Sequence, residues 1–458
     1  MPARRPTAPT QITAVVAREV LDSRGRPTVE AEVHCGKVRG WAIAPSGAST
    51  GRHEAHELRD TDERRYQGQG VLGAVSHVRK MLAPAVVGLD AADQQAIDFA
   101  LCETDGTPDK SRCGANAILA VSLAAAHAAA AVAGIPLARH MHELLRRALL
   151  TQKSREAPAM SLPLPMVNMI SGGKHAGGQL DFQDYLMVPV GATSYSEALE
   201  WTVRVYAALG RELRNAGYEG TLVGDEGGYG PRLPDNETAL LYLTGAIEAV
   251  GFEPGRDVAI ALDVAATHFY ADGEYRLKSE GGRTLSAAGM VDRLADWVAR
   301  YPIVSIEDGL AEDDWDGWQL LTRTLGEQIQ LLGDDLFTTN VALIEQGIER
   351  QAANSVLIKL NQIGTVWETL LALAVCHKAK YRPVVSARSG ESEDASIADL
   401  AVGTGAGQIK IGSVARSERL AKYNRLLRLE EWLGAEASFA GGEIVTPLSR
   451  VKPRTRRA

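Results

Sequence analysis

From about residue 180 onward the chain repeats one pattern, in which a short apolar run ends in a polar or charged residue and an amphipathic segment follows. Such runs occupy residues 185–189, 221–226, 258–263, 303–307, 329–334, 356–359, 384–388 and 408–410. From the second run on, their last residues lie between 22 positions (388 to 410) and 44 positions (263 to 307) apart. This spacing suits one strand and one helix per interval. Eight such units predict an α/β fold of the (β/α)8 barrel type, in which reactive side chains gather at the carboxyl ends of the strands.

The first 150 residues follow a different pattern. Residues 28–34 alternate between polar and apolar positions and 40–44 form a second short apolar run, so both are predicted strands. Residues 45–51 are too rich in glycine and serine for a strand or a helix. Residues 70–86 and 116–133 have the apolar spacing of helices. This part of the chain is therefore predicted to be an α+β domain.

A break in composition separates the two patterns. Charge and three prolines interrupt any helix within residues 151–165, which places the predicted domain boundary there. We predict an α+β N-terminal domain over 1–152, which begins with a disordered leader, 1–10, and a barrel domain over 153–458. The basic stretch 452–457 is expected to be a solvated end.

Composition narrows the classes of function. Lys and Arg number 49 against 57 Asp and Glu, so the formal net charge is −8, which offers no global field to hold nucleic acid or an anionic membrane. The alanine-rich stretch 115–138 contains polar residues and is too weakly hydrophobic for a membrane span, so we expect a buried helix. The four cysteines form no C-x-x-C pair, and a reducing, cytoplasmic location is the simplest expectation.

Three acids end consecutive predicted strands of the barrel, namely Asp263, Glu307 and Asp334. Oxygen ligands without thiolate or imidazole favour a hard cation, Mg²⁺ ahead of Mn²⁺. A single acid at a strand end most often caps the next helix. Three on consecutive strands favour a metal site.

Other strand ends supply cations and a further acid. Lys359 and Lys410 each follow an apolar run; a lysine near a second cation and bound metal ions has its ammonium form disfavoured, so it can act as a base. The alternative for each is an ion-paired or snorkelling lysine. Glu226 lies among glycines that allow the backbone to approach a ligand, or that simply form a surface turn. Arg388 and Ser389 offer a planar guanidinium and a hydroxyl to an anion such as phosphate.

Together these groups suit one class of reaction. A lysine base, an acid across from it, two metal ions and an arginine for an anion can remove a proton next to a carboxylate. Mg²⁺ would stabilise the ene-diolate, and a leaving group would then be expelled.

At these residues the chain resembles the enolase family. The resemblance runs from residues 17–25 to about Gly434, and it is specific over many blocks. The matching segments are PSGASTG (45–51), CGANAILAVSLA (113–124), GDEGG (224–228), YPIVSIEDGLAEDDWDGW (301–318), GDDLF (333–337), IKLNQIGT (358–365) and RSGESEDASIADLAVG (388–403). It implies an α+β N-terminal domain, a barrel with an irregular, partly antiparallel start, and assembly into a homodimer or homo-octamer.

The resemblance also implies a role for each site residue. The ligands of a first Mg²⁺ would be Asp263, Glu307 and Asp334, and Ser49, on a mobile loop, would bind a second. Lys359 would take the α-proton and Glu226 would help hydroxide to leave. The phosphate and carboxylate of a small phosphorylated hydroxy acid would be held by Arg388, Ser389, His175, Gln183 and Lys410.

Two positions depart from the family pattern inside the predicted pocket. Asp184 follows Gln183 where enolases carry a glutamate, which retracts this catalytic carboxylate by one C–C bond, about 1.5 Å. Ala387 precedes Arg388 where enolases carry a histidine. Both changes shrink a side chain around the same substrate.

Three hypotheses about function follow. The first is drift in an enolase of glycolysis that still dehydrates 2-phospho-D-glycerate to phosphoenolpyruvate. The second is a pocket enlarged for a bulkier substrate, as in the enolase relative of secondary metabolism that makes carboxyphosphonoenolpyruvate for phosphonate antibiotics from an analogue with an added carboxylate on phosphorus. The third, of a different class, is an enolase that has lost its activity and serves as a binding or scaffold protein.

Overall fold

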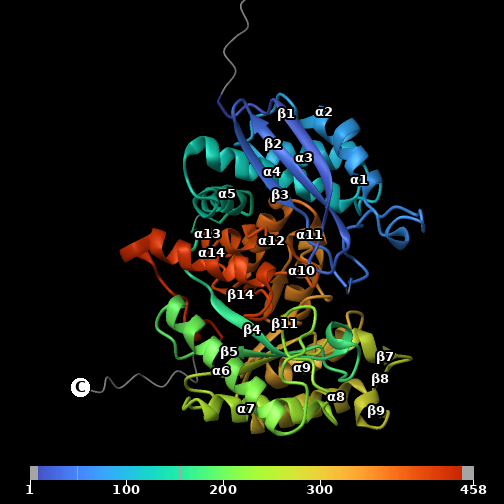
Figure 1. The fold of residues 1–458 in the computed structure, drawn as a ribbon, viewed down its shortest axis with the longest axis vertical. Coiled ribbons are helices and arrows are strands. Elements are labelled where there is room, and N and C mark those ends of the chain that lie inside the picture. The colour runs from blue at the N-terminus through green and yellow to red at the C-terminus, as the bar shows by residue number, and fades with distance from the viewer. Residues whose placement is uncertain (1–8, 49, 155, 446–458) are drawn as a thin grey trace, which may run out of the picture.

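The computed structural model describes residues 9–48, 50–154 and 156–445. A layer of sheet and helices formed by the N-terminal part lies against one end of a closed barrel, at the top in Figure 1. Most of the predicted leader, the predicted metal ligand Ser49 and the basic stretch 452–457 lie outside the described residues.

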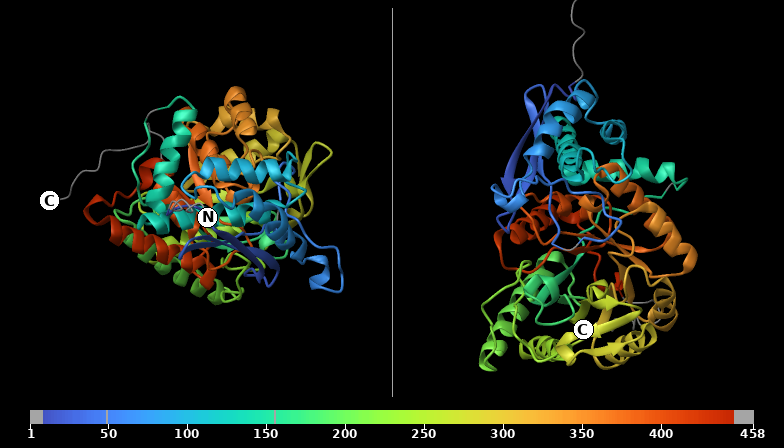
Figure 2. Two further views of the ribbon diagram at one scale, coloured as in Figure 1. Left: turned by 90° about the horizontal axis from the view of Figure 1, so that it is seen from above. Right: turned by 90° about the vertical axis from the view of Figure 1, so that its right-hand side faces the viewer.

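The N-terminal part is a three-stranded antiparallel sheet with helices on one side (Figure 2). Its strands are β1 (Ala14–Leu21), β2 (Pro27–Cys35) and β3 (Val38–Ile43). Its helices are α1 (Leu72–His77), α2 (Ala83–Val86), α3 (Gln94–Asp105), α4 (Ala115–Ala133) and α5 (Leu137–Thr151), and a π-helical turn, Val78–Leu82, joins α1 to α2. The predicted strands and helices of this part are confirmed, and β1 is added to them.

The alanine-rich helix α4 packs on β2 and β3 and is almost wholly buried. Small side chains are needed here because the sheet and the helix approach closely: a Cβ added at Gly40 would lie 2.2 Å from the backbone nitrogen of Ala128. Among the described helices, α4 is the one long and apolar enough to span a membrane, and 83% of its most apolar window is buried inside the protein. It ends at Ala133, because Gly134 takes the left-handed conformation of a helix cap.

The second part is the predicted barrel. Its strands close in the order β4 (Leu164–Ser171), β5 (Asp184–Val188), β6 (Ala259–Asp263), β10 (Ile303–Glu307), β11 (Gln330–Gly333), β12 (Ser355–Ile358), β13 (Arg382–Ser386) and β14 (Gln408–Lys410). The pairs β4·β5 and β5·β6 are antiparallel and the remaining pairs are parallel. This irregular start is the one that the family resemblance implies, and the α/β barrel with an α+β N-terminal part is confirmed.

Helices surround the barrel. They are α6 (Tyr195–Asn215), α7 (Asn236–Ala249), α8 (Ala287–Arg300), α9 (Trp315–Leu325), α10 (Val341–Arg350), α11 (Leu360–Ile363), α12 (Val366–Ala379), α13 (Ser396–Gly403) and α14 (Ser417–Leu433). A small antiparallel sheet follows β6 and is formed by β7 (Tyr270–Ala271), β8 (Glu274–Leu277) and β9 (Arg283–Leu285).

One predicted strand is wrong and one real strand was missed. Residues 221–226 form a loop, in which only an isolated bridge joins Val223 to Tyr229. Because β5 pairs directly with β6, with Asp184 opposite Asp263, no strand can lie between them. The missing eighth strand is β4, which starts inside the stretch interpreted as a domain break. Strand β4 was not predicted because it contains Pro165, and proline within an apolar run argues against a central strand.

His140 on α5 makes stability depend on pH. Its ring is buried, and its Nε2 atom has no hydrogen-bond partner within the described chain. Burial, with Arg147 and His127 nearby, lowers its pKa to about 4. The unfolded chain instead binds a proton there at about pH 6.5, so acidification through this window stabilises the unfolded state.

We therefore expect the wild type to lose about 2 kcal/mol of unfolding free energy between pH 7 and pH 5 that His140→Leu does not lose. The measurement is urea unfolding of both proteins at the two pH values. A stability difference that is the same at pH 5 and pH 7 would contradict the assignment.

Candidate active site

A polar cavity opens at the carboxyl ends of the barrel strands. It brings together nine of the predicted site residues: His175, Gln183, Glu226, Asp263, Asp334, Lys359, Arg388, Ser389 and Lys410. Two further predicted residues contact this lining: Asp184 bonds to His175 and Glu307 bonds to Lys410. Glu226 reaches the cavity from the loop 221–230, although that segment is not the strand predicted for it.

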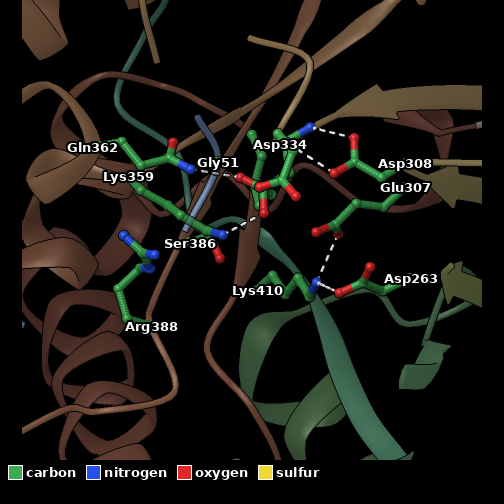
Figure 3. A network of polar contacts seen from close by, with 12 residues as sticks. Gly51, Asp263, Glu307, Asp308, Asp334, Lys359, Gln362, Ser386, Arg388 and Lys410 are labelled. Carbon is green, nitrogen blue, oxygen red and sulfur yellow. Dashed lines mark hydrogen bonds and ion pairs between the residues drawn. The ribbon is translucent and has the colours of Figure 1, made fainter. Parts of the chain in front are cut away.

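Two of the predicted metal ligands share a lysine. Asp263 ends β6 and Glu307 ends β10, where they are paired in register. The Nζ atom of Lys410 lies 2.7 Å from Asp263 Oδ2 and 2.7 Å from Glu307 Oε2 (Figure 3). Burial opposes the charge on Lys410, but these two carboxylates prevail and raise its pKa well above the ordinary value.

The third acid, Asp334, holds the other lysine. Lys359 Nζ lies 2.5 Å from Asp334 Oδ2, and Gln362 Nε2 donates to Asp334 Oδ1 at 2.8 Å (Figure 3). Burial opposes the ammonium form of Lys359, but the contact with Asp334 outweighs it and raises the pKa. With the Asp334 carboxylate facing it directly, Lys359 therefore favours its ammonium form. That bound metal ions disfavour this form stays a prediction.

The chemistry of the donor set suits a hard divalent cation, although of its three members Asp334 alone belongs to a described group of acids whose ligand atoms lie within 4.8 Å of one another. Asp263, Glu307 and Asp334 are all at least nine-tenths buried, and they present carboxylate oxygens alone. Glu307 Oε1 is buried and has no hydrogen-bond partner in the part of the chain that the structure describes, which is a costly state for a carboxylate oxygen. A cation among these three side chains would satisfy it.

Two acids that sequence reasoning missed adjoin this set, Asp308 and Asp335. Asp308 Oδ1 accepts from the backbone N–H of Asp334 at 2.9 Å, and its Oδ2 accepts from that of Asp335 at 2.8 Å. Ligand atoms of Asp308, Asp334 and Asp335 lie within 4.8 Å of one another. Burial and the nearby Asp334 raise the pKa of Asp335 to about 8. The only signal in the sequence was that each follows a predicted ligand directly.

Across the cavity, Asp184 is a partner of His175. Its Oδ2 lies 2.8 Å from His175 Nδ1, and its Oδ1 accepts from Asn168 Nδ2 at 2.5 Å and from Ser171 Oγ at 3.1 Å. With no exposed surface, Asp184 does not line the cavity itself. The geometry therefore makes it the residue that orients His175.

His175, Asp184 and Glu226 form one buried group whose ligand atoms lie within 4.8 Å of one another. Burial opposes the charge on His175, but Asp184 and Glu226 raise its pKa to about 9. Burial raises the pKa of Asp184. Burial also favours neutral Glu226, but His175 and Arg419 outweigh it and lower that pKa. The group therefore keeps a proton on its His175–Asp184 side near neutral pH.

The loop after β13 carries the predicted anion site. Arg388 and Ser389 both line the cavity, and so does Ala387. The fully buried Arg419 of α14 supports the loop from behind, since Nη1 donates to the carbonyl of Arg388 and Nη2 to that of Ser389, both at 2.6 Å. Sequence reasoning did not find Arg419, because nothing local to α14 marks its partners.

Two models of known protein families match the chain. The model described as Enolase, N-terminal domain, matches residues 12–141. The model described as Enolase, C-terminal TIM barrel domain, matches residues 159–448. Together the two matches span most of the chain.

Proposed function

This chain belongs to the enolase family, and from that premise we propose that it is a Mg²⁺-dependent hydro-lyase that converts 2-phospho-D-glycerate to phosphoenolpyruvate. The coarser statement, a metal-dependent enzyme of the enolase superfamily, rests on both family matches and on the buried acidic groups. The observation that carries the finer proposal is the meeting of Lys359, Lys410 and three strand-end carboxylates at one cavity.

Asp263, Glu307 and Asp334 would hold the cation. When bound, Mg²⁺ supplies positive charge for the substrate carboxylate and takes up the charge of Asp334, which otherwise keeps Lys359 protonated. Arg388, Ser389 and His175 bind and orient the phosphate and carboxylate of the substrate through charge-assisted hydrogen bonds.

Two proton transfers complete the reaction. Lys359 Nζ takes the proton from the carbon next to the carboxylate, and the electron pair of that C–H bond becomes the new C=C bond. The C–O bond of the hydroxyl on the next carbon breaks, and the oxygen leaves as water with a proton from the His175–Asp184–Glu226 group. Glu226, which lines the cavity, takes this proton from the His175–Asp184 side of the group and passes it to the leaving oxygen, while Asp184 keeps His175 in place.

The direct test is incubation of the protein with 2-phosphoglycerate and Mg²⁺. Formation of the enol phosphate is followed as a rise of absorbance near the ultraviolet edge. This product would also eliminate the alternative of an inactive scaffold protein. Absence of product from 2-phosphoglycerate would contradict the proposal, and absence of product from its carboxyphosphono analogue as well would favour the inactive scaffold protein.

A second candidate substrate is favoured by two side chains. Ala387 lines the cavity where enolases carry a histidine, and Asp184 is withdrawn behind the wall where they carry a glutamate. The shorter side chain leaves room beside the phosphate-binding loop at Ala387 and beside His175 at Asp184. The room suits a substrate with an added carboxylate on phosphorus, which would yield carboxyphosphonoenolpyruvate.

The substitution Ala387→His together with Asp184→Glu separates the two substrates. If the pocket is enlarged, refilling it is expected to raise kcat/KM for 2-phosphoglycerate, relative to the carboxyphosphono analogue, by about 10-fold or more, as pocket contacts typically discriminate. The measurement is kcat/KM for both compounds with both proteins. An unchanged ratio would remove the support for an enlarged pocket.

A further inference from the structure

We propose that Glu54 is a positioning residue that sets the orientation of both the anion-binding Arg388 and the metal ligand Asp334. Glu54 lies just after the glycine- and serine-rich residues 45–51 of the N-terminal part. It is 334 residues away from Arg388 in sequence. The roles of Arg388 and Asp334 rest on the proposed function, whereas the contacts that join Glu54 to them do not.

The first contact is a bidentate ion pair. Arg388 Nη1 lies 2.9 Å from Glu54 Oε2, and Arg388 Nη2 lies 3.2 Å from Glu54 Oε1. Asn361 Oδ1 accepts a further bond from Nη1 at 2.9 Å. Two parallel bonds define the plane of the guanidinium as well as its position. Both side chains are almost wholly buried, with 3% of Arg388 and 7% of Glu54 exposed.

The second contact leads to the metal site. Gln362 Nε2 lies 3.3 Å from Glu54 Oε1 and 2.8 Å from Asp334 Oδ1, so one amide joins the two carboxylates. Gln362 is itself fixed, because its Oε1 accepts from Thr339 Oγ1 at 2.8 Å. One oxygen of Asp334 is thereby held in place while the other faces Lys359 (Figure 3).

The backbone holds Glu54 rigidly in this position. Glu54 Oε1 accepts from the N–H of Gly51 at 3.0 Å, and the N–H of Ala55 donates to the carbonyl of Gln362 at 2.7 Å. A pre-organised carboxylate of this kind costs little entropy when the anion and the cation bind.

Electrostatics indicates what the loss of Glu54 would do. Burial opposes the charge on Arg388, and Glu54 and Asp334 are the carboxylates that most strongly counteract it and raise its pKa. Without the charge of Glu54, Asp334 would be the main counter-charge left to the guanidinium. Arg388 would then turn toward Asp334, away from the anion, and compete with a cation for that carboxylate.

The test is Glu54→Gln, with Glu57→Gln as the matched control. Glu57 lies on the same segment and pairs with Arg59 and with Ser46. Its charge also raises the pKa of Arg388, but less than that of Glu54 does, and no hydrogen bond between Glu57 and Arg388 is described. We expect Glu54→Gln to weaken Mg²⁺ binding, measured by titration calorimetry with Mg²⁺ alone, by about 10- to 100-fold. In a thermal-shift titration with inorganic phosphate, the phosphate concentration that gives half of the full shift should rise by at least about 10-fold. Glu57→Gln should leave both within twofold of the wild type.

A double-mutant cycle distinguishes positioning from a general structural role. If Glu54 acts on the anion through Arg388, Glu54→Gln should have little further effect on phosphate affinity in a protein that already carries Arg388→Gln. Effects that simply add in the double variant would overturn the proposal, as would equal affinities in Glu54→Gln and Glu57→Gln. If Glu54→Gln does not fold, Glu54→Asp serves instead, because it retains the charge and shortens the reach.

These readouts do not depend on turnover. Failure of the wild type to dehydrate 2-phosphoglycerate would contradict the proposed function and leave the binding comparison intact. If the wild type is active, Glu54→Gln should also lower kcat/KM. A high concentration of Mg²⁺ should restore kcat/KM only in part, because the variant still binds the substrate phosphate more weakly.

Discussion

Lys359→Ala is expected to lower kcat by about 10²- to 10⁴-fold, the range that a well-placed general base contributes. Lys359 directly follows β12 and lines the cavity, and under the proposed function its Nζ takes the proton next to the substrate carboxylate. The variant should still bind substrate, because Arg388 and Ser389 are unchanged. The measurement is the initial rate of enol phosphate formation at saturating Mg²⁺ and substrate.

The control for this substitution is Lys378→Ala, the same chemical change on an exposed side chain of α12. It should leave kcat within about twofold of the wild type. Loss of folding is checked by comparing the melting temperatures of the two variants. Retention of more than about a tenth of the wild-type kcat in Lys359→Ala would remove Lys359 as the base.

Removal of divalent cations is expected to lower turnover by at least about 100-fold, and Mg²⁺ should restore it. The physical reason is that Asp263, Glu307 and Asp334 place three buried carboxylates beside a substrate that is itself an anion. Without a metal ion, this charge is balanced among the described residues by the side chains of Lys359, Lys410 and Arg388. The measurement is the rate after exhaustive chelation and after titration with Mg²⁺.

The matching variant is Glu307→Gln, which removes one charge from the donor set. It should weaken Mg²⁺ binding in calorimetry by more than about 10-fold, whereas Glu345→Gln on the exposed surface of α10 should not change it. Full activity after chelation, or wild-type Mg²⁺ affinity in Glu307→Gln, would show that these acids do not hold the catalytic metal.

The elements with strong local signals were predictable. Strands β6 and β10 to β14 are short apolar runs that end in a polar residue, and each was found within a few residues. Their polar endings converge because a barrel brings the carboxyl ends of its parallel strands to one mouth. The start of the barrel was predicted less well, since Pro165 lies inside β4 and the apolar run before Glu226 is a loop. Pairing with β5 and β6, rather than composition, decides which segment becomes a strand there.

The partners of the site residues could not be predicted in the same way. Glu54 meets Arg388 across 334 positions of sequence, and Arg419 supports the loop of Arg388 from a helix whose own pattern shows no such role. The charge state of Lys359 also depended on its neighbour, because Asp334 faces it at 2.5 Å.

By itself, the sequence determined the barrel and the site residues at its strand ends, because local periodicity and strand endings are properties of short segments. The family, and with it His175 and Gln183, followed instead from the segments that resemble enolases. Only the tertiary structure decided that Asp184 stands behind His175, that Lys359 is held as an ammonium by Asp334, and that Glu54 joins the anion site to the metal site. These are properties of contacts between distant segments. Such contacts form only when tertiary packing brings the segments together, and burial then shifts the pKa of each ionisable group in them.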